Sequence, residues 1–261
     1  MDLGLRDLGA FVTGASGGIG LALCGAFAAE GAKVAACSRR PVPPSEGLVP
    51  LQADVRDPAA MDEAMRRAEQ AFGRVDLCVA NAGIWPEASL PLHELPEARI
   101  REVMETNLLG AIWTARAFLA SLARTGPRGD GRGAALVFIG STAGRFGEKG
   151  HAEYAASKAA LRGLVLTLKN EIVALDPRGR VNLVDPGWTV TPMAAEVLAR
   201  DGAMGAVTRT MPLRQLASPE DVARAVLVLA SPVTSRHVSG EALTVAGGME
   251  GRVLWDDPKI V

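Results

Sequence analysis

Tyr154 and Lys158 are the two side chains in this sequence best suited to acid-base chemistry. Tyr154 is the single tyrosine of the chain, and Lys158 follows it by four residues. On a helix, this spacing places both side chains on one face, separated by roughly 6 Å of rise. A neighbouring ammonium stabilises the phenolate and so lowers the pKa of a phenol from its usual value near 10. The pair therefore indicates an enzyme that moves protons, although a Tyr and a Lys can also share a surface helix by chance.

A glycine-rich segment near the start of the chain makes chance less plausible. Residues 13–20 read Thr-Gly-Ala-Ser-Gly-Gly-Ile-Gly, between an apolar run at 8–12 and a helical pattern at 21–30. Glycines at this spacing let the backbone approach a pyrophosphate, while the helix that follows offers its first N–H groups to the phosphates. The segment predicts a dinucleotide site at a strand-to-helix turn.

Strand and helix patterns alternate along the rest of the chain. Further strands are expected at residues 33–37, 48–53, 75–80, 134–139, 180–184 and 241–245, and helices at 58–72, 94–122 and from Tyr154 to Ile172. Parallel strands joined by helices form a doubly wound sheet, so we expect one α/β domain over residues 1–261: a Rossmann-type sheet of seven parallel strands flanked by helices. Residues 192–217 lack a clear period and are interpreted as a partly helical lid over a substrate pocket, or as a surface loop.

The composition excludes several classes of partner. The formal net charge is -1, from 28 basic and 29 acidic residues, so neither nucleic acid nor an anionic membrane is expected. Asp2 and Asp7 stand where a signal peptide would need basic residues, and no apolar run approaches the roughly 18 residues of a membrane span. We expect a cytoplasmic protein. Cys24, Cys37 and Cys78 lie in apolar segments without neighbouring histidines, which favours core positions over a metal site.

Other residues extend the pattern into that of a known family. Together with the glycine turn and Tyr154-x-x-x-Lys158, the chain carries, in order, Asn81-Ala82-Gly83, Asn107, Ser141 and Pro186-Gly187. In order and separation, these residues resemble the classical short-chain dehydrogenase/reductase family and are similar to its 3-oxoacyl-[acyl-carrier-protein] reductase-like members. The resemblance runs from Thr13 to Gly248. One departure is Ala246, where relatives often have an aspartate before the paired glycines.

The resemblance implies a catalytic tetrad of Asn107, Ser141, Tyr154 and Lys158. Ser141 would position the substrate carbonyl oxygen, and Tyr154 would give that oxygen its proton or take one from the alcohol. Lys158 would also bind the ribose hydroxyls, and Asn107 would hold a water that links Lys158 to solvent. The implied activity is NAD(P)-dependent interconversion of a ketone and a secondary alcohol, acting on a small molecule such as a 3-oxoacyl thioester or a cyclic or sugar-like alcohol. The alternative is a nucleotide-sensing regulator that keeps the fold without turnover.

The resemblance also implies a set of coenzyme contacts. They are Gly14, Ser16, Gly17, Gly18, Ile19, Gly20, Ser38, Arg39, Asp54, Val55, Asn81, Ala82, Gly83, Tyr154, Lys158, Pro186, Gly187, Thr189 and Thr191. At the end of the second strand, an acid would bind a ribose 2'-hydroxyl, whereas cations favour a 2'-phosphate. Ser38-Arg39-Arg40 supplies cations there, so NADP(H) is favoured and NAD(H) is possible. Against this, Gly17 stands where many NADP-preferring relatives carry a basic residue.

Substrate contacts and assembly are less constrained by the sequence. The expected substrate wall is formed by Trp85, Thr142, Glu148, His151, Trp188 and Met193, each of which could instead be ordinary packing. The resemblance implies a homotetramer, or a homodimer, built on the helix that contains Tyr154. The apolar stripe from Leu161 to Ile172 fits either that interface or burial within one subunit. Trp255 near the C-terminus could pack across a subunit boundary.

Overall fold

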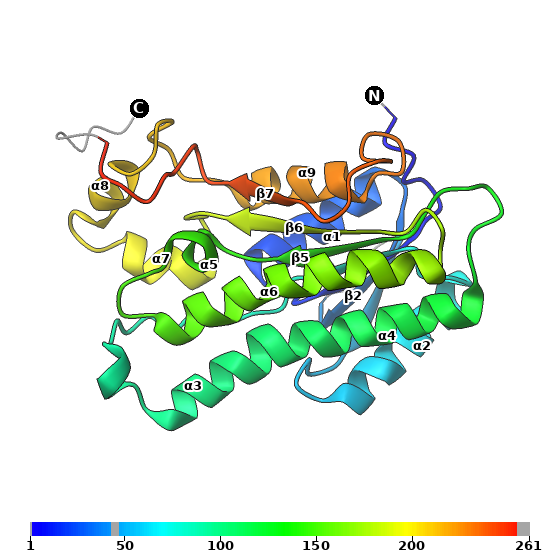
Figure 1. The fold of residues 1–261 in the computed structure, drawn as a ribbon, viewed down its shortest axis with the longest axis horizontal. Helices are drawn as coiled ribbons and strands as arrows, with labels where there is room; N and C mark the ends of the chain where they lie inside the picture. The colour runs from blue at the N-terminus through cyan, green and yellow to red at the C-terminus, as the bar shows by residue number, and fades with distance from the viewer. Residues whose placement is uncertain (1, 43–46, 255–261) are drawn as a thin grey trace.

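A single parallel sheet organises the chain. The computed structural model describes residues 2–42 and 47–254, and its seven strands lie in the order β3-β2-β1-β4-β5-β6-β7. The strands are β1 (Gly9–Thr13), β2 (Lys33–Ser38), β3 (Leu48–Gln52), β4 (Leu77–Ala80), β5 (Ala135–Ile139), β6 (Arg180–Pro186) and β7 (Ala242–Val245). All neighbouring strands pair in parallel (Figure 1). The predicted doubly wound, seven-stranded sheet is therefore confirmed.

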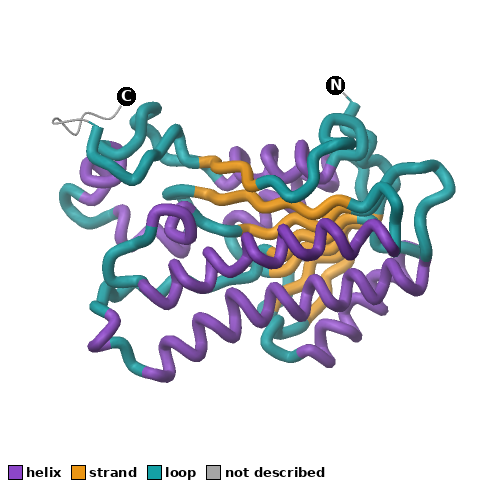
Figure 2. The backbone as a smooth tube through the Cα atoms, in the orientation of Figure 1, coloured by secondary structure: helices purple, strands orange, loops and turns teal. Residues whose placement is uncertain are grey.

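Helices cover both faces of this sheet. One face is covered by α2 (Pro58–Phe72), α4 (Gly110–Thr125) and α6 (Ala152–Glu171), and the other by α1 (Gly18–Ala29) and α9 (Pro219–Ala230). Figure 1 shows α4 and α6 in front of the sheet and α1 and α9 behind it, and Figure 2 shows the same layers as a tube. With both faces covered, a central strand has no polar side, which explains why the strands read as continuous apolar runs.

Successive residues of each central strand enter opposite hydrophobic cores. Phe11 and Phe138 pack in the core under α2, α4 and α6, whereas Val12 and Val137 pack under α1 and α9. All four are at most 1% exposed. Each such side chain contributes roughly 1.5–3 kcal/mol by burial, so the two cores together hold the strands in register. Cys24, Cys37 and Cys78 are buried in these cores as predicted.

The helix predicted over residues 94–122 is interrupted. It consists of a short 3-10 turn at Leu92–Glu94, then α3 (Glu97–Met104), a π-helical turn at Glu105–Leu109, and α4. A π turn inserts one extra residue and is common at functional sites. Here it contains Asn107, which is 1% exposed and faces the protein interior. Helical periodicity alone does not reveal such an insertion.

Helix α9 was missed by the sequence prediction. Ser218 caps it by accepting a hydrogen bond from the Asp221 N–H, and the Asp221 side chain accepts from the Ser218 N–H in return. Pro219 occupies the first turn, and Val222 and Val226 are fully buried against the sheet. This capping box was the available signal. Helix α5 (Thr142–Phe146), which follows Ser141, was also not predicted.

The segment predicted as a lid contains two short helices, α7 (Pro192–Leu198) and α8 (Ala203–Thr208). Its two ends are held together, because the Val190 N–H donates to the Ala217 carbonyl and the Ala217 N–H donates to the Trp188 carbonyl. The segment is thus a partly helical excursion with a closed base. The role of residues 192–217 as a lid over a substrate pocket stays a prediction.

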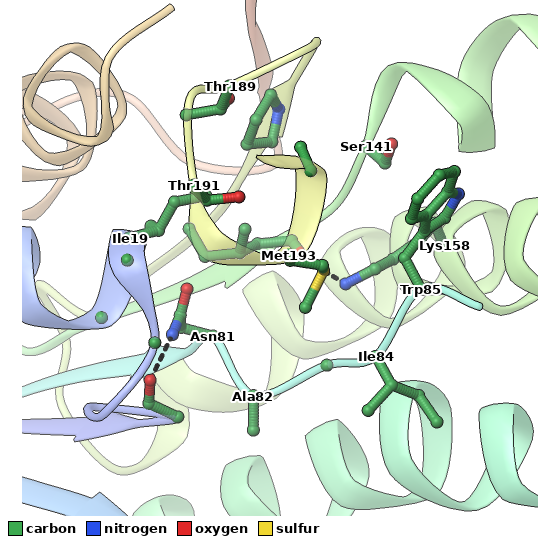
Figure 3. A pocket seen from close by; sticks show the side chains of 18 of the residues that line it. Ile19, Asn81, Ala82, Ile84, Trp85, Ser141, Lys158, Thr189, Thr191 and Met193 are labelled. Carbon is green, nitrogen blue, oxygen red and sulfur yellow. Dashed lines mark hydrogen bonds between the residues drawn. The ribbon is translucent and has the colours of Figure 1, made fainter. Parts of the chain in front are cut away.

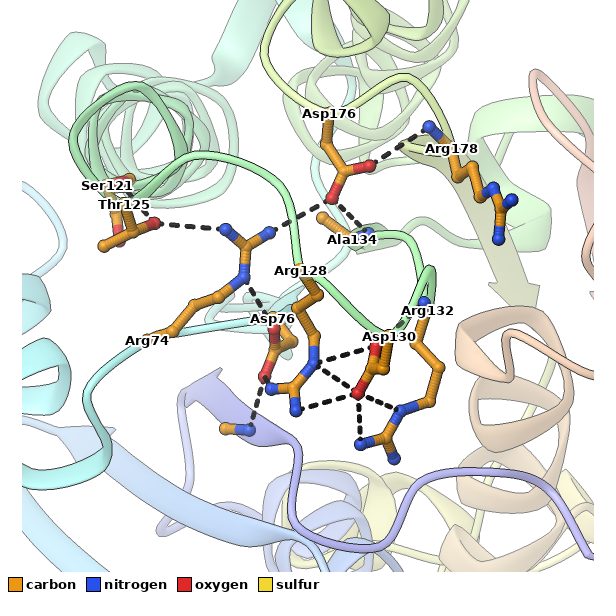
Figure 4. A network of polar contacts seen from close by, with 11 residues as sticks. Arg74, Asp76, Ser121, Thr125, Arg128, Asp130, Arg132, Ala134, Asp176 and Arg178 are labelled. Carbon is orange, nitrogen blue, oxygen red and sulfur yellow. Dashed lines mark hydrogen bonds and ion pairs between the residues drawn. The ribbon is translucent and has the colours of Figure 1, made fainter.

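A network of ion pairs lies at the amino-terminal ends of the strands, away from the glycine turn at their carboxyl ends (Figure 4). Arg74 contacts Asp76 at 2.7 Å and Asp176 at 3.1 Å, and Arg128 contacts Asp76 at 3.2 Å. Asp76 also accepts the Gly9 N–H, which ties β1 to the network. These contacts join four segments that are distant in sequence, and so they stabilise the edge that lies away from the predicted site.

Helix α6 carries the apolar stripe proposed for assembly. Leu161, Val165 and Ile172 are at most 2% exposed and belong to the core of this same chain. Burial within one subunit therefore accounts for the stripe, and assembly as a homotetramer or homodimer stays a prediction. Trp255 lies outside the described residues. Among the helices that the structure describes, none combines the length and hydropathy that a membrane span requires.

Candidate active site

The glycine turn lies at the crevice between the carboxyl ends of β1 and β4. Gly14 has a φ of +66°, and a Cβ at this position would lie 2.8 Å from the Ala82 Cα. The Asn81 side-chain amide donates to the Thr13 carbonyl at 2.8 Å. The turn therefore packs directly against the Asn81-Ala82-Gly83 segment, because Gly14 has no Cβ and Asn81 supplies an amide donor. Together the two segments form one side of a cavity.

This cavity has a volume of about 460 Å³ and extends from the glycine turn to the Tyr154–Lys158 pair (Figure 3). The predicted coenzyme contacts that line it are Gly14, Ser16, Gly17, Gly18, Ile19, Gly20, Asn81, Ala82, Gly83, Tyr154, Lys158, Pro186, Gly187, Thr189 and Thr191. Gly17, the residue before α1, has no side chain that could cap the first turn, which leaves the N–H groups of this turn to a phosphate. The site thus fits an extended dinucleotide along the edge of the sheet.

The residues predicted to contact the adenosine half of the coenzyme do not line this cavity. Ser38 is 5% exposed, and its hydroxyl donates to the Arg40 carbonyl. Asp54 is engaged by the Arg56 guanidinium, which lowers the pKa of this carboxyl. Val55 is buried against Gly110, where a Cβ would lie 2.6 Å from the Val55 side chain. The structure does not bring Ser38, Arg39, Asp54 or Val55 to the cavity wall; it brings Arg40, which the sequence prediction had not selected as a contact.

Ser141 and Tyr154 lie side by side in the cavity wall, Ser141 just before α5 and Tyr154 on α6. The Ser141 hydroxyl accepts the Ala143 N–H at 3.1 Å and caps α5. Burial raises the pKa of Tyr154 to about 12, opposed by a hydrogen bond from Ser141. The expected lowering of this pKa by Lys158 is therefore not achieved by the protein alone. Desolvation of the phenol outweighs the effect of the Ser141 hydrogen bond, and the charges of Glu148 and Asp185 raise the pKa further.

Lys158 reaches the same cavity from one turn further along α6. Its Nζ lies 5.9 Å from the Tyr154 ring centroid and donates to the Ile139 carbonyl at 2.9 Å. Burial lowers the pKa of Lys158 to about 8, while the charge of Asp185 acts in the opposite direction. The predicted side-chain pair is thus placed on one helical face, with the ammonium beneath the phenol.

Asn107 uses its side chain to fix the chain that follows β4. Its Oδ1 accepts the Ile84 N–H at 2.8 Å, and its Nδ2 donates to the Ile84 carbonyl at 2.9 Å and to the Ser157 hydroxyl at 3.2 Å. A Cβ on Gly83 would lie 3.2 Å from both Asn107 Oδ1 and Lys158 Nζ. Asn107 therefore positions the backbone beside Lys158, and its implied water contact stays a prediction.

The chain after β6, which is predicted to contact the nicotinamide, forms another side of the cavity. Thr189 donates to the Gly187 carbonyl at 3.0 Å. A Cβ on Gly18 would lie 3.1 Å from the Thr191 side chain, so the start of α1 and this loop are in close approach. Gly187 abuts Ala246, since a Cβ on Gly187 would lie 2.7 Å from the Ala246 methyl group. The small residue at 246 fits this contact.

The expected substrate wall is an aromatic and acidic cluster. Trp85 stacks on His151 with ring centroids 4.9 Å apart and meets Trp188 edge-on at 5.8 Å. Trp85 Nε1 donates to Glu148 Oε1 at 3.1 Å. Thr142, Glu148, Met193 and the two tryptophans line the cavity, whereas His151 is 4% exposed and lies behind Trp85. Of the six predicted wall residues, five therefore face the cavity and His151 supports one of them.

His151 and Glu148 lie side by side at this wall. His151 Nε2 lies 2.8 Å from the Pro86 carbonyl, which can only accept, so Nε2 is the donor. His151 Nδ1 then faces Glu148 Oε1 at 3.3 Å. Burial raises the pKa of Glu148, which favours its uptake of a proton from solvent.

Asp185 is another residue beside the site that the sequence prediction did not select. It lies at the end of β6, is 3% exposed, and accepts the Ser141 N–H at 3.1 Å. A carboxylate immediately before Pro186-Gly187, at the carboxyl edge of a predicted strand, was the available signal.

Comparison with known proteins identifies the family. Residues 9–202 match the family model for short chain dehydrogenase. The chain belongs to the short-chain dehydrogenase family. As a short-chain dehydrogenase it is an NAD(P)-dependent oxidoreductase, which confirms the enzyme and the family predicted from the sequence.

Relatives of this short-chain dehydrogenase cover nearly its whole length. The 3-oxoacyl-[acyl-carrier-protein] reductase MabA of Mycobacterium bovis is 34% identical over 91% of this chain and 91% of its own. The reductase FabG of Escherichia coli is 34% identical over 92% of this chain and 96% of its own. A Brucella melitensis 3-ketoacyl-(acyl-carrier-protein) reductase complexed with NADH superimposes with a TM-score of 0.83 at 25% identity, over 94% of this chain and 98% of that one.

Proposed function

We propose that this short-chain dehydrogenase interconverts a ketone and a secondary alcohol by hydride transfer, with Tyr154 as the general acid or base. The observation that carries the proposal is that Ser141, Tyr154 and Lys158 line the same cavity as the glycine turn. A dinucleotide held at the start of α1 would thus extend to the reacting side chains. When bound, the nicotinamide coenzyme supplies or accepts the hydride.

The raised pKa of Tyr154 leaves the phenol in the protonated form that ketone reduction requires. Because burial raises the pKa of Tyr154 to about 12, the phenol is protonated at neutral pH and is ready to act as an acid. The Ser141 hydroxyl, which contacts the phenol, would donate to the carbonyl oxygen in a complex with substrate. As Tyr154 loses its proton, the ammonium of Lys158 would stabilise the phenolate.

For the coenzyme, we propose NADP(H) in preference to NAD(H). The support is the pair Arg39-Arg40, where Arg40 lines the cavity and both side chains are exposed. Guanidiniums bind a 2'-phosphate through charge-assisted, bidentate hydrogen bonds. No carboxylate stands at Ser38 to select a free 2'-hydroxyl.

For the substrate, we propose a 3-oxoacyl thioester. The 3-oxoacyl-[acyl-carrier-protein] reductases that are 34% identical to the chain support this class. Ile84, Trp85, Trp188 and Met193 offer an apolar wall to an acyl group beside Ser141. A small cyclic or sugar-like alcohol is the competing substrate, and Glu148 would favour it by accepting hydrogen bonds from hydroxyl groups.

The test is the rate at which the purified protein oxidises NADPH and NADH, followed by the absorbance of the reduced ring. We compare two carbonyl substrates with reduced coenzyme, a 3-oxoacyl thioester and a simple cyclic ketone. A sugar-like alcohol is tested in the reverse direction with oxidised coenzyme. We expect the highest kcat/KM with the thioester and NADPH. Coenzyme binding without turnover of any carbonyl or alcohol would instead identify a nucleotide-sensing regulator, a function disfavoured by the presence of Ser141, Tyr154 and Lys158 together.

A further inference from the structure

Asp185 is a buried carboxylate that the proposed mechanism does not use. It is the sixth residue of β6, directly before Pro186, and its side chain is 4% exposed. A buried carboxylate is costly unless it is paired and hydrogen-bonded. Its partners therefore indicate what the protein gains by keeping it there.

The two carboxylate oxygens connect the site to two elements. Oδ1 accepts the backbone N–H of Ser141 at 3.1 Å. Oδ2 lies 3.3 Å from Nη2 of Arg162, which stands one turn beyond Lys158 on α6. A Cβ on Gly140 would overlap Oδ1, so the glycine before Ser141 makes room for this carboxylate. Asp185 thus fixes the backbone at Ser141 from beneath.

Charged and titratable groups face Asp185 from each element packed against it. They are Arg145 on α5, together with Lys158, Arg162 and Tyr154 on α6. Arg145 donates to Thr244 of β7, which holds it on the solvent side. Arg162 is half exposed, whereas Lys158 is buried. Of these groups, Lys158 and Tyr154 are the ones that the proposed reaction uses.

We propose that Asp185 is a positioning residue that holds Ser141 and, through its negative charge, sets the pH range in which Tyr154 and Lys158 work. The proposal rests on the proposed function of these two side chains. A negative charge stabilises the protonated forms of both neighbours. Asp185 therefore keeps the lysine an ammonium and the phenol an acid, against the burial that favours the neutral amine.

The pH dependence of Asp185→Asn tests the proposal. The amide keeps the shape and the acceptor for the Ser141 N–H but removes the charge. We expect the alkaline limb of the pH profile for ketone reduction to move to lower pH by about one unit. Arg162→Gln leaves the carboxylate unshielded, so we expect its alkaline limb to move to higher pH. Asp62→Asn, which removes a carboxylate paired with Arg116 on the surface, is the matched control and should not move it.

A second measurement does not depend on activity. The chain has five lysines, so NMR titration of labelled lysine side chains, with Lys158→Met for assignment, reports the Lys158 pKa directly. We expect Asp185→Asn to lower this pKa and Arg162→Gln to raise it. If the wild-type protein reduces no ketone, the proposed function fails, and the lysine titration still decides the role of Asp185. An unchanged Lys158 titration in Asp185→Asn, or shifts of the same sign in both variants, would overturn the proposal.

Discussion

Gly83 lies beside both the Lys158 ammonium and the Asn107 amide oxygen, at a place where a side chain would crowd both atoms. A Cβ at residue 83 would lie 3.2 Å from both atoms, closer than neighbouring side chains normally allow. Gly83 therefore lets the chain after β4 pass beside the base of the active site. The relationship connects the π turn, which supplies Asn107, with the α6 lysine.

Gly83→Ala should displace Lys158 or Asn107 and reduce kcat/KM by roughly 10- to 100-fold, because small displacements of a catalytic group are costly. The matched control is Gly163→Ala on α6, where an added Cβ meets nothing within 4 Å. Steady-state kinetics and thermal unfolding of both variants measure the effect. Equal kinetic losses in the two variants would contradict a local role for Gly83.

Tyr154→Phe removes the phenolic proton while keeping the ring. We expect kcat to fall by roughly 10²- to 10⁴-fold, the usual contribution of a general acid or base. Coenzyme affinity, measured by fluorescence titration, should stay close to that of the wild-type protein, since the glycine turn is untouched. Near-normal turnover would refute the assignment of Tyr154.

The stability of the protein should depend on pH through Lys158. Burial lowers its pKa to about 8 from 10.5 in the unfolded chain. Between these values the unfolded chain binds more protons, so the contribution of Lys158 to the free energy of unfolding rises with pH, by at most roughly 3 kcal/mol. In Lys158→Met this contribution is absent. We therefore expect the free energy of unfolding in urea, wild type minus Lys158→Met, to be larger at about pH 10 than at about pH 7. The same difference at both pH values would show that the pKa of Lys158 is not lowered.

The arginines after β2 should discriminate between coenzymes. Arg39→Gln and Arg40→Gln each remove a potential partner of the 2'-phosphate, and we expect NADPH binding to weaken by roughly 10- to 100-fold for the residue that makes the contact. NADH, which lacks the phosphate, serves as the matched control in the same titrations. Equal losses for NADPH and NADH in both variants would remove the argument for NADP(H).

The sequence by itself determined the parallel sheet, the glycine turn and the order of the site residues. Their signals are local: the turn needs glycines at fixed spacing, and a strand covered on both faces needs a continuous apolar run. The four-residue spacing of Tyr154 and Lys158 likewise fixed one helical face.

The tertiary structure decided what depends on contacts between distant segments. The hydrogen bonds of Asn107 to Ile84 and Ser157, the packing of α9 on the sheet and the contact of Asp185 with Ser141 join residues far apart in the chain. The same holds for the pKa of Tyr154, which a local lysine was expected to lower but which burial raises. Burial and charge act through space, and so residue spacing alone could not predict their balance.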